Sequence, residues 1–121
     1  MPTEVATPDA DPVGFAADAN SHVNDINKDL DDIVLTVQEG GFFRLISNYT
    51  ELVFNVSQLE TLDVPVSVST TWPAALTSLD ASVEAYYDAI TTEDPAVILA
   101  SVDAVRLANE AARAVANSAN G

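Results

Sequence analysis

Apolar residues recur at steps of three and four positions in four separate stretches of the chain. This spacing places them on one face of an α-helix, because a helix turns once every 3.6 residues. The first stretch carries Ala16, Ala19, Val23, Ile26, Leu30, Ile33 and Val37. The others carry Phe42, Leu45, Tyr49, Leu52, Val56 and Leu59; then Trp72, Leu76, Leu79, Val83, Tyr86 and Ile90; then Val97, Ile98, Val105, Ala108, Ala112 and Val115. The pattern predicts an all-α fold, a four-helix bundle of antiparallel up-down-up-down topology.

Proline, glycine and acidic residues mark the expected ends of these helices. Asp11-Pro12 and Asp94-Pro95 each offer an acid as N-cap and a proline in the first turn. Gly40-Gly41 tolerates the left-handed backbone at which helices often end. We expect helices at about 12–39, 42–59, 72–91 and 95–117 in a single domain over 12–119, preceded by a flexible acidic leader with prolines over 1–11. The segment around Pro65 is rich in β-branched residues and predicts an extended connection.

The charge of the chain is strongly negative. Its 121 residues include 19 acids and four basic residues, for a formal net charge of −15. Such a surface repels phosphate backbones and anionic lipids, so we expect no nucleic-acid binding. No apolar run reaches the roughly 20 residues of a membrane span, so we expect no membrane insertion. With 48% hydrophobic residues the chain is expected to fold, and its charge favours cationic partners or a salt-rich setting.

Candidate catalytic and metal-ligating residues are scarce. Asp18, Asp25, Asp32 and Glu39 recur every seven residues, which sets neighbours about 10 Å apart along a helix, too far to share one calcium ion. His22 is the only histidine, cysteine is absent, and no Glu-x-x-His motif of a di-iron bundle occurs. We therefore expect no catalytic residues, no metal site and no cofactor, and interpret the protein as a non-enzyme.

A few apolar residues fall beside the core stripes. Phe43 and Phe54 lie at the edge of the second stripe and are either covered by the leader or the 60–70 connection, or exposed as an apolar patch. Leu107 lies at the margin of the fourth stripe. The candidate partner-contact residues are these three together with Arg44, Arg106 and Arg113 at the rim.

The run "YTELVFNVSQLETLDVPVSVSTTWPAALTSLDASVEAYYDAI", residues 49–90, has a recognisable spacing of apolar residues and proline. The spacing is carried by Leu59, Leu62, Pro65, Trp72, Leu76 and Leu79. It resembles the helix–proline linker–helix segment of small, Ala- and Asp-rich all-helical proteins exported by actinobacteria. These proteins largely lack an assigned activity. The resemblance implies a cell-surface or extracellular accessory role and transfers no functional residues.

Three functions remain open from the sequence. The leading hypothesis is a non-enzymatic helical module that binds a protein partner, associates with itself or forms part of a surface or virion-like particle. The alternative is a bundle that binds a small ligand, with a pocket lined by Trp72, Tyr86 and the phenylalanines. An enzyme is the third and weakest interpretation. We expect an extracellular or cell-surface location, and the alternative is the cytoplasm of a salt-tolerant organism or a virion.

Overall fold

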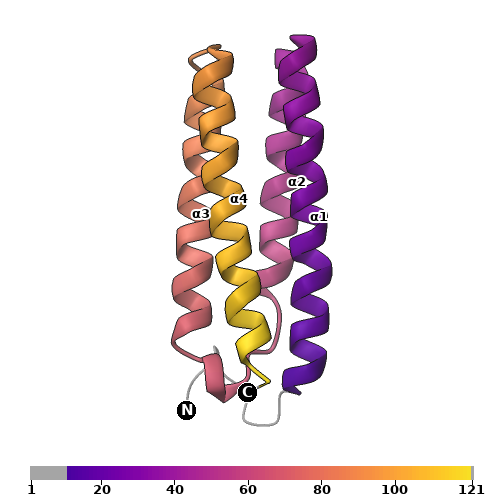
Figure 1. Ribbon diagram of the computed structural model, residues 1–121, viewed down its shortest axis with the longest axis vertical. Helices are drawn as coiled ribbons and strands as arrows, with labels where there is room; N and C mark the ends of the chain where they lie inside the picture. Colours follow the sequence, from indigo (N-terminus) through magenta and orange to yellow (C-terminus); the bar gives the residue numbers. More distant parts are fainter. Residues whose placement is uncertain (1–10, 121) are drawn as a thin grey trace.

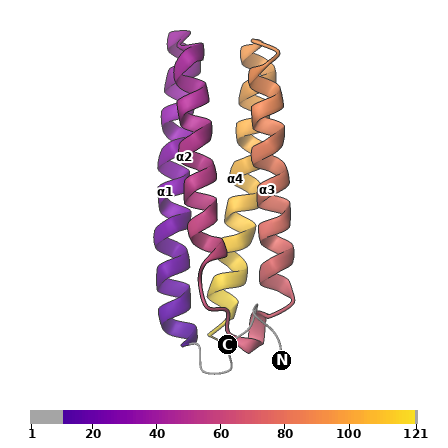
Figure 2. The same ribbon diagram turned by 180° about the vertical axis from the view of Figure 1, so that it is seen from behind.

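The computed structural model describes residues 11–120, which form an all-α four-helix bundle. The helices are α1 (Pro12–Glu39), α2 (Phe42–Glu60), α3 (Thr71–Ile90) and α4 (Pro95–Ser118), and one 3₁₀ turn, η1, spans Val66–Val68. They run alternately up and down, with the α1–α2 and α3–α4 turns at the same end (Figures 1 and 2). The expected fold class is confirmed, and each helix boundary lies within one residue of the expected one. The expected leader, Asp11 apart, lies outside the described residues.

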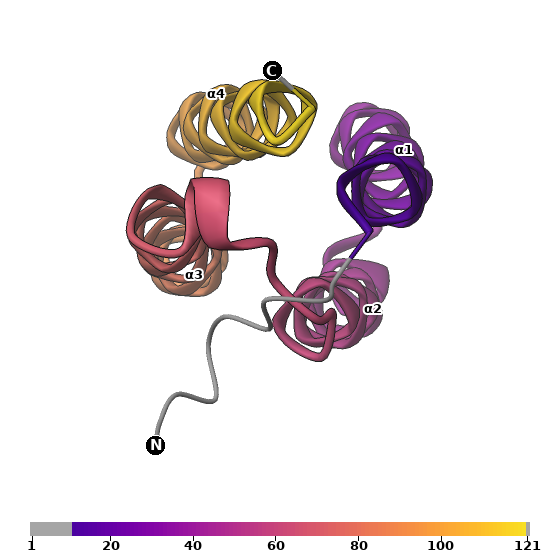
Figure 3. The same cartoon turned by 90° about the horizontal axis from the view of Figure 1, so that it is seen from below.

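The four helices stand at the corners of a square when seen along the bundle axis (Figure 3). Contacts are made between α1 and α2, α2 and α3, α3 and α4, and α4 and α1. As a result, α2 and α4 lie diagonally across the bundle. Their outward faces therefore point in different directions and do not form one continuous surface.

The core consists mostly of the side chains that the helical periodicity placed on the inner faces. On α4 the expectation for Val97 is wrong, because its side chain is exposed, and Val102 and Ala116 are buried there instead. Leu30, Leu52, Leu79 and Val105 are fully buried, one from each helix. Tyr86 is also fully buried, and its Oη donates a hydrogen bond of 3.1 Å to the carbonyl oxygen of Leu45. The phenol thus satisfies its polar atom while its ring fills the centre of the bundle.

The helix ends follow the expected chemistry. Asp11 Oδ1 accepts a hydrogen bond from the backbone N–H of Val13 at 3.0 Å, and Asp94 Oδ1 accepts one from Ala96 at 2.9 Å. Gly40 has a φ of +77° and ends α1 with its N–H bonded to the last turn. This left-handed backbone turns the chain sharply into α2. A residue with a Cβ would be strained in the same conformation.

The connection between α2 and α3 differs in part from the extended segment expected from Pro65. Its centre is the 3₁₀ turn η1, and Val64 before the turn and Val68 at its end bury their side chains against the bundle. Ser67 Oγ donates a hydrogen bond of 3.1 Å to the Ala119 carbonyl oxygen, which ties the connection to the end of α4. Burial of the two valines explains why the backbone coils here. The connection closes the end of the bundle opposite the Gly40 turn (Figure 1).

Candidate functional site

The outward side of α2 carries large apolar residues. Phe43 is 93% exposed and Phe54 is 61% exposed, and Ile46 and Val53 are also exposed on the same side. Together with Thr50 these residues form the α2 outer face, which lies opposite the buried stripe of Leu45, Leu52, Val56 and Leu59. The expectation that the 60–70 connection covers the phenylalanines is wrong, because both are exposed, and the leader that was the other expected cover lies, Asp11 apart, outside the described residues.

The α2 outer face contrasts with the outward sides of the other helices. Exposed acids occur on those sides, namely Asp18, Asp32 and Glu39 on α1, Asp80, Glu84 and Asp88 on α3, and Asp103 on α4, and large apolar residues such as Leu35 and Leu107 are exposed there singly. In α2 the charged residues are Arg44, Glu51 and Glu60, none of which belongs to the outer face. A cluster of large exposed apolar side chains on a chain this acidic is typical of a contact surface.

A groove of about 440 Å³, the upper groove, lies beside Phe43. It is formed where α2 and α3 meet the two turns at the upper end of the bundle in Figure 1. Its lining residues are Gly40, Phe42, Phe43, Ile46, Tyr87, Ile90, Thr91 and Glu93. The ring of Tyr87 packs on that of Tyr49, with centroids 4.7 Å apart, and Tyr49 Oη donates a hydrogen bond of 2.7 Å to Glu84. The groove therefore has a mainly apolar floor held by an aromatic pair.

A second groove of about 600 Å³, the acidic groove, lies on the α1 side of the α2 outer face. Its lining residues are Lys28, Asp29, Asp32, Thr50, Glu51, Phe54 and Asn55. Asn55 Nδ2 donates a hydrogen bond of 2.6 Å to Asp29 Oδ2. Partial burial raises the pKa of Asp29 above its usual value, and the nearby charges of Glu51, Asp25 and Asp32 act in the same direction. This groove thus combines an aromatic ring with closely spaced acids.

Of the other predicted contact residues, Arg44 lies on α2, and Leu107, Arg106 and Arg113 lie on α4. Leu107 is 75% exposed on α4, diagonally across the bundle from α2. Arg106 pairs with Asp31 of α1 at 3.1 Å, and Arg113 is also engaged in contacts with α1. Arg44 pairs loosely with Glu39 at 3.9 Å, where both side chains are exposed. The structure therefore brings Phe43, Phe54 and Arg44 together on α2, and it separates Leu107, Arg106 and Arg113 from them.

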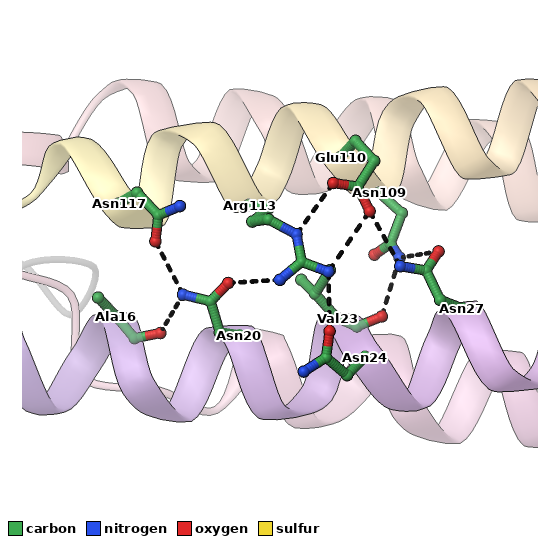
Figure 4. Close-up of polar contacts among 9 residues, drawn as sticks. All are labelled: Ala16, Asn20, Val23, Asn24, Asn27, Asn109, Glu110, Arg113 and Asn117. Carbon is green, nitrogen blue, oxygen red and sulfur yellow. Dashed lines mark hydrogen bonds and ion pairs between the residues drawn. The ribbon is translucent and has the colours of Figure 1, made fainter.

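Arg113 belongs to a polar seam between α1 and α4 that the sequence analysis did not identify (Figure 4). Its guanidinium donates to Asn20 Oδ1 at 2.7 Å, to Asn24 Oδ1 at 2.8 Å and to Glu110 Oε1 at 2.9 Å. The fully buried Asn109 donates to the Val23 carbonyl oxygen at 3.0 Å. Further hydrogen bonds of the seam join Asn27 to Glu110 and Asn20 to Asn117.

The residues of the alternative ligand pocket do not form one cavity. Trp72 and Tyr86 are buried in the core, whereas Phe43 and Phe54 face outward. Trp72 packs edge-on against Phe15, with ring centroids 4.9 Å apart. A small ligand that contacted the exposed phenylalanines would therefore lie in one of the surface grooves beside α2.

Comparison with known proteins found no relative of this chain. No protein-family model, curated sequence or solved structure matches the chain. Within residues 11–120, no helix is both long and apolar enough to cross a membrane. The same part of the chain contains no group of three or more His, Asp or Glu residues arranged to hold a metal ion.

Proposed function

We propose that the protein is a non-enzymatic helical module that binds a protein partner through the α2 outer face. The observation that carries the proposal is the exposure of Phe43 and Phe54 on a helix side without charge, beside two grooves. Aromatic side chains of this kind dominate the energetics of protein interfaces, because their large apolar area leaves water on binding. The rest of the bundle acts as a rigid scaffold for this face.

Binding of a small apolar ligand in the upper groove is the second candidate. Its volume of about 440 Å³ falls within the range of ligand sites, roughly 300–1,000 Å³. The partner proposal is favoured because the exposed apolar residues continue past the groove to Phe54, which lies about 16 Å from Phe43 along the helix at 1.5 Å per residue. A small ligand would leave that end of the face uncovered.

The setting of this module is also a proposal. The resemblance of residues 49–90 to exported actinobacterial proteins favours an accessory role outside the cell or at its surface. The net charge of −15 is equally suited to the cytoplasm of a salt-tolerant organism or to the surface of a virion-like particle. A protein-binding module fits each of these settings.

The test compares variants of α2 with a matched variant of α4. The parent, the double variant Phe43→Ser/Phe54→Ser and the control Leu107→Ser serve as bait in an extract of the native source. All three substituted side chains are exposed, so circular dichroism should report equal helix content. We expect a stoichiometric protein partner with the parent and with Leu107→Ser, and its loss with the double variant.

Two outcomes would contradict the proposal. A partner that stays bound to the double variant, but leaves when the acids of α1 are reversed in charge, would place the interface on α1. A small molecule that co-purifies with the parent and not with the double variant, with no protein partner present, would favour the ligand-binding alternative.

A further inference from the structure

We propose that the occupant of the α2 outer face is a cationic amphipathic helix. Its apolar side would lie on Phe43 and Phe54, and its Lys or Arg side chains would contact the acids of the two flanking grooves. This inference rests on the proposed function, because it names the class of partner that the same face would bind.

The shape of the face suits a helix. Phe43 and Phe54 are 11 residues apart, which is three turns and about 16 Å along α2. A helix that lies along α2 presents apolar residues at the same spacing, at positions i, i+4, i+7 and i+11. The upper groove borders the face on the α3 side, and the acidic groove borders it on the α1 side. The contact surface is thus elongated and concave on both flanks.

The charges around the face select a cationic occupant. Asp29, Asp32 and Glu51 line the acidic groove together with one cation, Lys28, and Glu93 lines the upper groove. Arg44, the basic residue of α2, is paired with Glu39. Of the ion pairs formed by residues 11–120, none includes these four acids. A Lys or Arg from a partner would relieve the repulsion among the acids of the acidic groove, and it would also find the ring of Phe54 beside them for a cation–π contact.

A second copy of the chain fits this face less well. Each copy carries a formal charge of −15, so two copies repel each other at moderate salt. The acids of the two grooves would face further acids from the outward sides of the partner copy's helices. The charge of the whole molecule and the local charge of the grooves therefore favour the same class of occupant.

The test uses designed peptides as probes. The first is an amphipathic helix of about 18 residues with Leu at i, i+4, i+7 and i+11 and Lys at the polar positions. The second replaces each Lys by Glu, and the third contains the residues of the first in an order without helical periodicity. Binding to the full chain is measured by isothermal titration calorimetry at several NaCl concentrations, and the contact site is mapped by amide chemical shifts.

The expected result is binding of the first peptide alone, with affinity that falls as salt rises. The double variant Phe43→Ser/Phe54→Ser should weaken this binding by about tenfold or more, as for residues at the centre of an interface. Asp29→Asn/Glu51→Gln should weaken it several-fold. The matched controls Leu107→Ser and Asp18→Asn/Asp103→Asn, which change exposed residues away from the face, should leave the affinity within about twofold.

Other outcomes would overturn the inference. Equal binding of the Glu peptide at the same face, or a dimer in sedimentation experiments that the Phe43→Ser/Phe54→Ser double variant abolishes, would exclude the cationic occupant and leave the α2 face as the binding site. If the first and the third peptide both bind, and the double variant does not weaken their binding, the peptides are attracted by net charge alone. In that case the capture experiment decides separately whether the proposed function also fails.

Discussion

At the scale of single residues, Glu93 has an unusual backbone. Its φ of +55° lies in the left-handed region, and among residues 11–120 it is the one non-glycine residue with a positive φ. That conformation costs an L-residue about 1–2 kcal/mol, because Cβ approaches the following carbonyl oxygen. The same residue lines the upper groove. The Glu93 side chain is thus placed at the groove at a cost in backbone energy.

Replacing Glu93 should separate stability from binding. Glu93→Gly removes the backbone strain, and we expect the free energy of unfolding in urea to rise by about 0.5–1 kcal/mol, after the greater entropy of the unfolded glycine is allowed for. Glu93→Gln keeps the strain and should leave stability unchanged. Both variants should weaken the binding of the cationic peptide. A loss of stability in Glu93→Gly would mean that the side chain makes stabilising contacts that outweigh the strain.

At the scale of helices, the α1–α4 contact differs from a purely apolar one. The chain has four basic residues, and two of them, Arg106 and Arg113, contact α1 from α4. Asn109 is fully buried and bonded to α1, although its Oδ1 has no hydrogen-bond partner among the described residues. A buried asparagine of this kind specifies how two helices align, because any other register would leave it without its partner. We therefore expect the seam to fix the register of α1 against α4, which apolar stripes alone would specify less strongly.

Replacing Arg113 by alanine should therefore lower the free energy of unfolding more than replacing Arg44 by alanine does. Arg113 is partly buried and contacts two asparagines of α1 and Glu110, so we expect Arg113→Ala to lower the free energy of unfolding by about 1–2 kcal/mol. Arg44→Ala, which removes a long and exposed pair with Glu39, should change it by less than about 0.5 kcal/mol. Chemical denaturation of both variants at neutral pH measures the difference. Equal losses would show that the seam contributes no more than a surface pair.

The pH dependence of the Arg113→Ala effect follows from Glu110. Hydrogen bonds from Asn27 and Arg113 lower the pKa of Glu110 below its ordinary value of 4.5. A carboxyl with a lowered folded pKa stabilises the fold above its unfolded pKa, and this contribution is lost as pH falls through the folded value. The difference in the free energy of unfolding between the parent and Arg113→Ala should therefore become smaller below about pH 4.5. If this difference does not change with pH, the loss of stability in Arg113→Ala comes from the asparagine contacts alone.

The sequence predicted the helices and the core more completely than the surface. Steps of three and four in the apolar residues define one face of a helix, so the buried positions of Leu30 and Leu79 followed directly. The seam was missed because asparagine is also common on exposed helix surfaces. The spacing of Asn20, Asn24 and Asn27 beside the first core stripe was the available signal. The separation of Leu107 from Phe43 depends on which helices are diagonal, and the apolar pattern alone does not contain that information.

At the scale of the whole molecule, charge and apolar surface are divided among the helices. Acids occupy the outward sides of α1, α3 and α4, whereas the α2 outer face is apolar. The bundle is about 42 Å long, the length of the 28 residues of α1 at 1.5 Å each. At 0.01 M salt the Debye length of about 30 Å lets acids at distant points of this surface repel one another, whereas at 0.1 M it is only about 10 Å. Added salt should therefore remove much of the repulsion.

We expect the melting temperature to rise with NaCl, most steeply between about 0.01 and 0.3 M, because screening changes fastest there. The three ion pairs of the described residues weaken over the same range, but they are exposed or partly exposed and contribute little. The matched variant Asp18→Asn/Asp32→Asn/Asp103→Asn carries −12, since three charges are removed from −15. It should melt higher than the parent at 0.01 M and respond less to salt. A flat or falling curve for the parent would show that repulsion does not limit stability, and it would remove the physical argument for a salt-rich setting.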